Sequence, residues 1–291
     1  MVTPQSISSM VGWISIWVWV CVYSPQLQEN YQLKSGEGLS IIFVAIWLAG
    51  DALNMIGAWI EGLLPTMIIL AAYYCLCDVA LIWQYYYYRK YHDYFHPPPR
   101  PASVNANPAA SESTPLLNGN STTTETIREK PRSPTLGEEI AKCFAGLAFT
   151  TIAGVVSWYI TAVVGWPNQS SFVALEQKEW RWDGQAAGWA SALLYLSSRI
   201  PQIFKNRETK CEGLSLALFV FAVVGNLTYV ASILIKDMSR DYVIENLSWL
   251  IGSSGTVFLD FVVLGQFIVY REERERLVRE REANESSIIT A

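Results

Sequence analysis

The sequence predicts an all-α membrane protein with seven transmembrane helices in two related halves. Hydrophobic residues make up 51% of the 291-residue chain and charged residues only 16%, against about 25% charged in soluble domains. Apolar runs close to the ~20 residues that cross a bilayer recur along the chain. They lie near residues 10–28, 39–60, 66–88, 141–165, 186–204, 213–235 and 246–270. A repeated residue pattern is the third observation, and it indicates how these runs are organised.

The repeat consists of three blocks that occur twice in the same order. The first block is Gly-Trp-x-Ser followed by a Pro-Gln pair, the second is Gly-Leu-Ser followed by Gly-Asp or Gly-Asn, and the third is Asp-x5-Gln-x3-Tyr-Arg. The blocks start at Gly12, Gly38 and Asp78 in the first copy and at Gly188, Gly213 and Asp260 in the second. This agreement in order and spacing indicates an internal duplication.

The duplication divides the chain into segments. Residues 1–90 are expected to form the first three-helix repeat and 186–270 the second, with one linker helix at 141–165. An odd number of helices must separate two repeats of the same orientation, so we expect a 3+1+3 plan with parallel repeats, as in SWEET-type transporters. Residues 166–185 form a polar loop in which Asn168-Gln169-Ser170 is a glycosylation acceptor if the loop is luminal. Residues 271–291 form a charged tail, expected to be a solvated helix rather than a binding surface.

The distribution of Lys and Arg predicts the orientation in the membrane. With a luminal N-terminus, seventeen of them fall on the cytoplasmic side, together with the C-terminus. The other side holds four, which are Lys178, Arg181, Lys236 and Arg240. No positive charge precedes the first apolar run, so we expect that run to be a retained helix rather than a signal peptide.

Residues 91–140 differ from the rest of the chain. Eight of the thirteen prolines fall in 97–134, among Ser, Thr, Asn and Ala, and such a segment cannot bury enough apolar surface to order itself. We therefore expect a disordered cytoplasmic linker. Within it, Glu112 precedes the pair Leu116-Leu117 by four residues. This spacing resembles the acidic dileucine signal that clathrin adaptors bind and implies delivery to a lysosome or vacuole; the alternative is a chance apolar pair.

Acidic residues within membrane runs are costly and indicate function. The chain has three clear ones, Asp51, Asp78 and Asp260. Asp51 is the strongest candidate for binding a substrate cation, because a carboxylate makes charge-assisted hydrogen bonds. Its counterpart in the second copy is the neutral Asn226, an asymmetry that suits a substrate with unlike ends.

Asn54 lies three residues after Asp51, and Tyr229 lies three residues after Asn226, so each shares a helical face with the earlier residue. These two residues complete the candidate substrate site. Asn226 and Tyr229 could hold an α-amino or α-carboxylate group. The alternative interpretation of these residues is polar packing between helices.

The remaining two acids occupy equivalent positions in the two copies. Asp78 and Asp260 are candidates for a structural or gating role, or for carrying a transported proton. Arg199 stands where the first copy has Tyr23. We expect it to pair with one of the acids or with a lipid phosphate.

The paired prolines are candidate hinges. Proline removes a helix hydrogen bond and clashes with the carbonyl four residues back, so Pro25 frees the carbonyl of Cys21 and Pro201 that of Ser197. Equivalent kinks in both repeats would serve alternating access, whereas a passive bend is the ordinary alternative. Gln26 and Gln202 follow the prolines and can bond a freed backbone group or a facing helix.

Together these motifs resemble the PQ-loop family, and within it the lysosomal and vacuolar cationic amino-acid transporters. The resemblance rests on Leu48-Ala49-Gly50-Asp51-x-x-Asn54, Thr66–Tyr74, Ser198–Gln202 and Lys210–Ser215. It implies transport of lysine and arginine, with histidine a third candidate, by alternating access across the membrane of an acidic organelle. Protons are a candidate coupling ion.

Two other function classes compete with transport. A seven-helix amino-acid sensor or signalling scaffold at the same membrane is the alternative. An enzyme is not expected, because the two histidines, His92 and His96, lie at the start of the linker. The five scattered cysteines suggest neither a disulfide framework nor a metal site. No cofactor and no nucleic-acid partner are expected.

Overall fold

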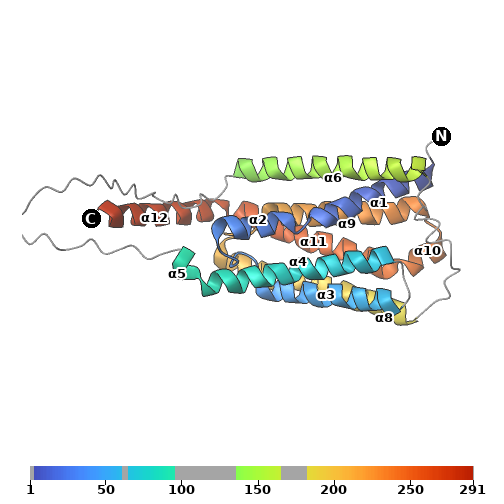
Figure 1. Ribbon diagram of the computed structural model, residues 1–291, viewed down its shortest axis with the longest axis horizontal. Coiled ribbons are helices and arrows are strands. Elements are labelled where there is room, and N and C mark those ends of the chain that lie inside the picture. Colours follow the sequence, from blue (N-terminus) through green and yellow to red (C-terminus); the bar gives the residue numbers. More distant parts are fainter. Residues whose placement is uncertain (1–2, 61–64, 96–135, 165–181, 291) are drawn as a thin grey trace, which may run out of the picture.

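The protein is a bundle of long helices (Figure 1). The computed structural model describes residues 3–60, 65–95, 136–164 and 182–290. The expected sorting signal, Glu112 with Leu116 and Leu117, and the glycosylation acceptor at Asn168 lie outside the described residues. In the described part the elements are α1 (Pro4–Cys21), α2 (Ser24–Leu33), α3 (Ile41–Ile60), α4 (Pro65–Lys90), α5 (His92–Phe95), α6 (Leu136–Val164), α8 (Trp182–Thr209), α9 (Leu216–Lys236), α10 (Arg240–Glu245), α11 (Leu247–Val269) and α12 (Arg271–Thr290).

Within the described residues, five helical segments are long and apolar enough to cross a membrane. They are Pro4–Leu33, Ile69–Lys90, Gly137–Val163, Leu216–Lys236 and Leu247–Val269. In α3 the apolar stretch Ile41–Ile56 is shorter, and the 28-residue α8 carries the buried polar residues Arg199, Gln202 and Asn206. The structure is thus all-helical with five candidate spans, and the seven-helix 3+1+3 plan stays a prediction.

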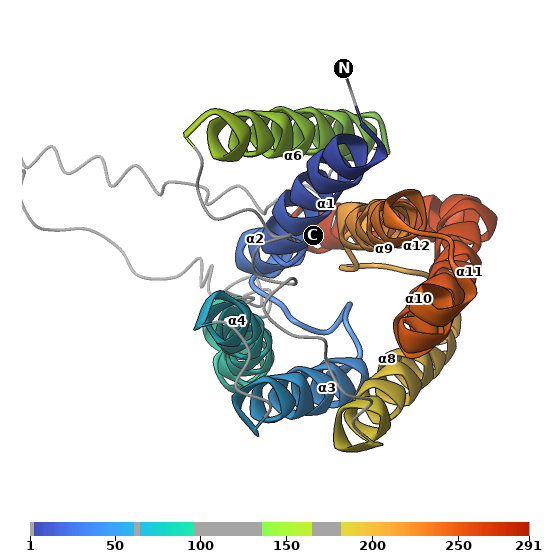
Figure 2. The same ribbon diagram turned by 90° about the vertical axis from the view of Figure 1, so that its right-hand side faces the viewer.

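Helices from the two repeats interleave. The first helix of the first repeat, α1, packs on α9 of the second repeat, while α8 packs on α3. Within the repeats, α4 lies against α3 and α2, and α11 lies against α8 and α9. Seen end-on, these helices surround a common centre, and α6 lies outside them against α1 and α9 (Figure 2). Each repeat therefore buries its apolar faces against the other one.

The apolar core follows from this interleaving. On α3, Phe43 and Trp47 are four residues apart and share one helical face, where they are 0% and 3% exposed. They meet Phe219 of α9, whose ring centroid lies 6.1 Å from that of Phe43, and Tyr23, 5.5 Å from Trp47. By contrast, large apolar side chains of α6 such as Phe144 are exposed, as expected for a helix that faces lipid.

The two Pro-Gln pairs differ in backbone structure. In the first repeat the helix breaks: α1 ends at Cys21 and α2 begins at Ser24, with Pro25 in its first turn. The Ser24 hydroxyl donates to the Cys21 carbonyl at 2.7 Å, which satisfies the group that the proline leaves without a partner. In the second repeat α8 continues through Pro201. The apolar run expected near 10–28 is therefore two helices, whereas its counterpart is one.

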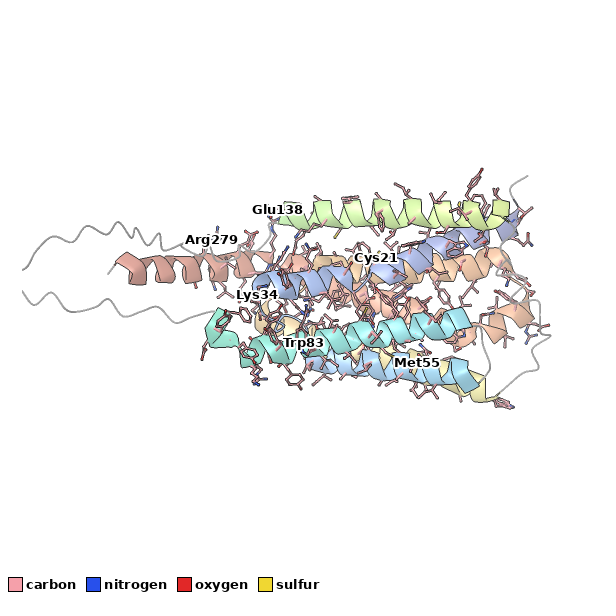
Figure 3. All side chains as sticks on the ribbon, in the orientation of Figure 1. Cys21, Lys34, Met55, Trp83, Glu138 and Arg279 are labelled. Carbon is pink, nitrogen blue, oxygen red and sulfur yellow. The ribbon has the colours of Figure 1, made fainter. Side chains whose placement is uncertain are left out.

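The ends of α2 and α4, with Lys34, Arg89 and Lys90, lie toward the end of the bundle that carries α12, where Lys210 pairs with Glu273; we call this the basic end (Figure 1). Lys34 lies toward the same end as Arg279 of α12, and Met55 lies toward the opposite end (Figure 3). Lys34 and Lys210 end their helices at equivalent positions with left-handed backbone, φ 51° and 55°.

The Gly-Leu-Ser segments that follow meet across the repeats. A Cβ built on Gly38 would lie 2.0 Å from the carbonyl carbon of Gly213. Gly213 itself has a φ of 72°, which L side chains rarely adopt. The two glycines therefore allow two backbone segments to touch at the basic end.

Replacement of Gly38 by alanine should destabilise the protein. The added methyl group overlaps backbone atoms of Gly213, and such overpacking costs about 1–3 kcal/mol. Gly265→Ala is the matched control, because a Cβ there meets nothing within 4 Å. Thermal unfolding of the purified full-length protein in detergent should show a lower midpoint for Gly38→Ala and an unchanged or higher one for Gly265→Ala. Equal midpoints would mean that the two segments do not meet in the membrane protein.

Candidate functional site

Each Pro-Gln glutamine binds the backbone of the opposite repeat. Gln26 accepts a hydrogen bond from the Ser215 amide at 2.8 Å and donates to the Gly213 carbonyl at 3.0 Å. Gln202 accepts from the Ser40 amide at 2.7 Å and donates to the Gly38 carbonyl at 3.2 Å. Both side chains are fully buried. The sequence left two possible partners for these glutamines, a backbone group freed by the proline or a facing helix. In the structure both glutamines bind backbone groups of the other repeat. We call these four hydrogen bonds the glutamine clamp.

Two further amides support each clamp glutamine. Gln26 donates its second hydrogen to Asn30 at 2.8 Å, and Asn30 donates to Gln84 at 3.0 Å. The second repeat contains the same chain, from Gln202 to Asn206 at 2.8 Å and on to the Gln266 side chain at 2.7 Å. Sequence reasoning assigned no role to the two asparagines. The signal was present, since both copies read Pro-Gln-x3-Asn.

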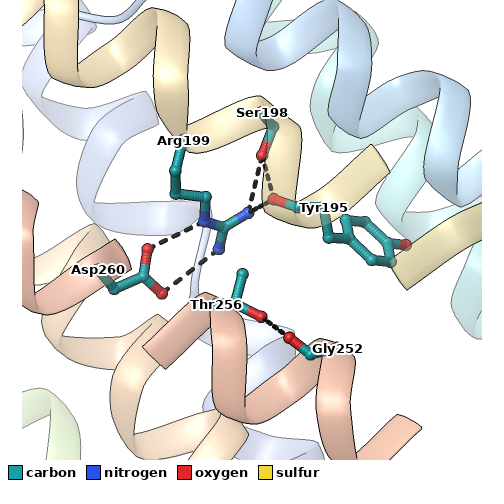
Figure 4. Close-up of polar contacts among 6 residues, drawn as sticks. All are labelled: Tyr195, Ser198, Arg199, Gly252, Thr256 and Asp260. Atoms are coloured by element: carbon teal, nitrogen blue, oxygen red, sulfur yellow. Dashed lines mark hydrogen bonds and ion pairs between the residues drawn. The ribbon is translucent and has the colours of Figure 1, made fainter. Parts of the chain in front are cut away.

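Arg199 and Asp260 form a buried ion pair between α8 and α11 (Figure 4). The Nε–Oδ1 distance is 2.9 Å and the Nη2–Oδ2 distance 3.4 Å, and both side chains are at most 1% exposed. The remaining donor Nη1 reaches the Tyr195 carbonyl and the Ser198 hydroxyl. Trp47 of α3 lies 4.9 Å from the guanidinium carbon. The charge of Asp260 is therefore neutralised within the protein.

Asp51 on α3 is the centre of a second buried polar cluster. The Tyr195 hydroxyl donates to its Oδ1 at 2.5 Å, and the Tyr23 hydroxyl donates to its Oδ2 at 3.2 Å. Asn54 donates to the Tyr195 oxygen at 2.7 Å. Asp51 is 5% exposed, so in this structure it is shielded from solvent. This cluster brings together the predicted Asp51 and Asn54 with two tyrosines from α8 and the α1–α2 break.

Asp78 on α4 belongs to this cluster and not with its counterpart Asp260. Its carboxyl group interacts electrostatically with that of Asp51. Asp78 is fully buried and neither of its oxygens receives a hydrogen bond within the described residues. Two ionised carboxylates buried near each other repel, and a shared proton or a bound cation would relieve that repulsion. Tyr23 stands where the second repeat has the neutralising Arg199, which leaves Asp78 without an ion-pair partner in the described part of the chain.

Asn226 and Tyr229 lie on α9, and within the described residues no hydrogen bond joins either side chain to Asp51. Asn226 is 5% exposed, and its side-chain nitrogen is buried without a partner. Buried donors of this kind are rare in proteins unless water or a ligand satisfies them. Their role in substrate binding stays a prediction.

Two site residues were not found from the sequence. Tyr195 is the counterpart of Trp19 in the first repeat, and Tyr23 is the counterpart of Arg199. The replacement of an indole by a phenol at one of two equivalent positions is the signal that could have identified Tyr195, because it introduces a hydroxyl donor.

Fold and site together define a polytopic helical membrane protein in which two related halves enclose a buried, charged centre. A model described as the PQ loop repeat matches residues 7–67 and 184–239. The chain belongs to the PQ-loop family, in the branch that contains vacuolar and lysosomal amino-acid transporters.

Three relatives illustrate this branch. The vacuolar lysine transporter YPQ1 of Saccharomyces cerevisiae is 37% identical over 295 residues, which cover 93% of this chain and 96% of the relative. The vacuolar arginine/histidine antiporter YPQ2 of the same yeast is 30% identical, covering 95% of this chain and 89% of the relative. The lysosomal amino acid transporter 1 homolog of Gallus gallus is also 30% identical, covering 95% and 84%.

The Arg199–Asp260 pair should behave as a structural unit. Arg199→Leu leaves Asp260 buried without its cation, and breaking a buried pair in this way costs about 3–5 kcal/mol. The double variant Arg199→Leu/Asp260→Leu should recover most of that loss, because no charge is then left alone. Thermal unfolding measures both, with the exposed Arg207→Leu as control. Additive losses in the double variant would contradict the pairing.

Proposed function

We propose that this protein transports the cationic amino acids lysine, arginine and histidine across a vacuolar or lysosomal membrane by alternating access. The observation that carries the proposal is that Asp51 and Asp78 are both buried, on the adjacent helices α3 and α4, and that neither forms an ion pair in the described part of the chain. A buried anion without a partner is costly, and a substrate ammonium or guanidinium group supplies the missing charge with several hydrogen-bond donors. The names of the three relatives, which describe transport of lysine, of arginine and histidine, and of amino acids in general, support this substrate class.

In this proposal Asp51 is the counter-ion for the substrate side chain. Tyr195 and Tyr23 hold the carboxylate in place through their hydroxyl groups. The unpartnered side-chain nitrogen of Asn226 makes it a candidate for the substrate carboxylate, with Tyr229 beside it on α9. The charge difference between α3 and α9 then fits the two unlike ends of an amino acid.

Asp78 has a different role in the proposal. Without substrate, one proton shared between Asp51 and Asp78 removes the repulsion of two close carboxylates. An arriving cation replaces that proton, so substrate entry and proton release are coupled. Asp260, neutralised by Arg199, is structural and takes no part in this exchange.

Alternating access requires the glutamine clamp to open. The clamp and the Gly38–Gly213 contact close the basic end of the bundle. We infer that the helix break at Pro25 and the proline within α8 are the hinges for this opening. A sensor or signalling scaffold has no support from the relatives, whose names describe transport.

The remaining inferences concern topology and sorting. We infer seven spans in a 3+1+3 plan, with the segments at residues 1–90, 141–165 and 186–270, and with a luminal N-terminus and cytoplasmic C-terminus. The basic end, where Lys34, Arg89, Lys90 and Lys210 lie, then faces the cytoplasm. Glu112 with Leu116 and Leu117 is proposed as the sorting signal for a clathrin adaptor.

Replacement of Asp51 by asparagine tests the counter-ion role. The change keeps the shape of the site but removes its charge, so lysine and arginine affinity should fall by roughly one to three orders of magnitude. Affinity for neutral amino acids should not fall in parallel. Binding and counterflow of labelled lysine in liposomes that contain only this protein provide the measurements. Asp241→Asn, an exposed acid on α10, is the control. Retained lysine affinity in Asp51→Asn would exclude Asp51 as the counter-ion.

Replacement of Asp78 by asparagine tests the proton role. An amide cannot release the shared proton, so accumulation of lysine driven by a pH gradient should be lost, while lysine exchange at equal pH on both sides continues. Lysine affinity should change less than in Asp51→Asn, because Asp51 keeps its charge. Proteoliposomes assayed with and without a pH gradient give both rates. If the Asp78→Asn protein still accumulated lysine against the gradient, the proton would have to bind elsewhere.

A further inference from the structure

A pocket of about 410 Å³ lies outside the ring of helices, between α2, α6 and the start of α9. The residues that matter for its chemistry are Pro25, Glu29, Glu139, Lys142, Phe149 and Phe221. It shares no lining residue with the Asp51 cluster, whose members lie on α3, α4, α8 and the α1–α2 break. The pocket is therefore a separate place for a ligand.

One end of the pocket is charged and incompletely paired. Glu29 is only 8% exposed, and within the described residues it makes no hydrogen bond and no ion pair. Glu139 and Lys142 interact with it electrostatically from α6, and Arg274 acts on Glu139 from α12. No ion pair joins either glutamate to these cations in the described part of the chain. A cationic donor that entered the pocket would stabilise the Glu29 carboxylate.

The other end of the pocket is apolar and faces the surroundings of the bundle. Phe149 on α6 is 57% exposed, and its neighbours Phe144 and Ile152 on the same helix are 70% and 64% exposed. The candidate span of α6 begins at Gly137, so Glu139 and Lys142 lie in its first turns, at the depth of lipid head groups. A ligand that fits both ends is charged at the membrane surface and apolar further in.

We propose that this pocket binds an aminophospholipid with an ethanolamine head group. Its primary ammonium donates to Glu29 and Glu139, its phosphate lies at Lys142, and an acyl chain runs past Phe149. Ammonium hydrogens match carboxylate acceptors, whereas a choline head group has no N–H to donate. A serine head group adds a carboxylate that two glutamates repel. Discrimination among head groups is thus built into the charged end.

The position of the pocket connects it to the clamp. Pro25 lines it directly beside the α1–α2 break, and Ser215, whose amide Gln26 binds, lines it from α9. A lipid bound there contacts Pro25, next to Gln26, and Ser215, whose amide Gln26 binds. This inference does not depend on the proposed amino-acid transport, because the pocket shares no lining residue with the Asp51 cluster.

Native mass spectrometry of the purified full-length protein tests the lipid site. The protein is incubated in detergent with synthetic ethanolamine, choline or serine phospholipids of identical acyl chains, and retained lipid is counted. The ethanolamine lipid should be retained about tenfold more than the choline lipid, which corresponds to about one net hydrogen bond to a charged group. Glu29→Gln should abolish this preference, and Ala145→Trp, which fills the apolar end, should reduce retention of all lipids.

Two matched variants control for folding and surface effects. Glu208→Gln removes an exposed carboxylate at the end of α8, and Ala141→Trp adds an indole to α6 outside the pocket. Both should keep the ethanolamine preference, and thermal unfolding verifies that all four variants are folded. Equal retention of the three lipids, or an unchanged preference in folded Glu29→Gln, would overturn the proposal. Displacement of the lipid by free lysine in both wild-type and Asp51→Asn protein would overturn it as well and assign the pocket to an amino acid.

Discussion

The two repeats are held together by an exchange of hydrogen bonds between one glutamine side chain and one turn of backbone in each. Ser40 and Ser215 directly precede the first residues of α3 and α9, and the backbone N–H groups at the start of a helix have no acceptor within the helix. The side-chain oxygen of the glutamine from the opposite repeat accepts this N–H. The side-chain nitrogen of the same glutamine donates to the carbonyl of the glycine two residues earlier. Each repeat provides the glutamine that binds the unpaired backbone groups of the other repeat. The arrangement at the basic end therefore depends on both repeats.

The duplicated scaffold is symmetric in its polar network and asymmetric in its charges. The chains Gln26–Asn30–Gln84 and Gln202–Asn206–Gln266 repeat bond for bond. Yet Tyr23 and Arg199 stand at equivalent positions, and this one difference decides which of Asp78 and Asp260 has a cation. Structure is therefore encoded where the copies agree, and the candidate chemistry where they differ.

The sequence predicted what depends on local pattern: helices, the duplication, the Pro-Gln pairs and the acids within apolar runs. It did not predict that the first Pro-Gln pair breaks its helix while the second does not, because both copies have the same proline. The difference is the backbone between Cys21 and Ser24, where the serine hydroxyl bonds the Cys21 carbonyl. Nor did it predict Asp78 beside Asp51, which depends on how α3 and α4 are rotated against each other. Tyr195 reaches Asp51 from the other repeat, and no pattern within one repeat contains that contact.

The interleaving of α1 with α9 and of α8 with α3 has a consequence for how the protein is made. During synthesis the first repeat is inserted before residues 213–215 have been translated. Until then Gln26 lacks its hydrogen-bond partners, and the face of α1 that packs on α9 is uncovered. The native centre can therefore assemble only after the last helices have been inserted. The same geometry makes a single repeat self-complementary, since two copies of it could supply each other's missing bonds. A bundle of this kind is thus reachable from a dimer of half-length chains by fusion of their genes, with α6 added as the connection.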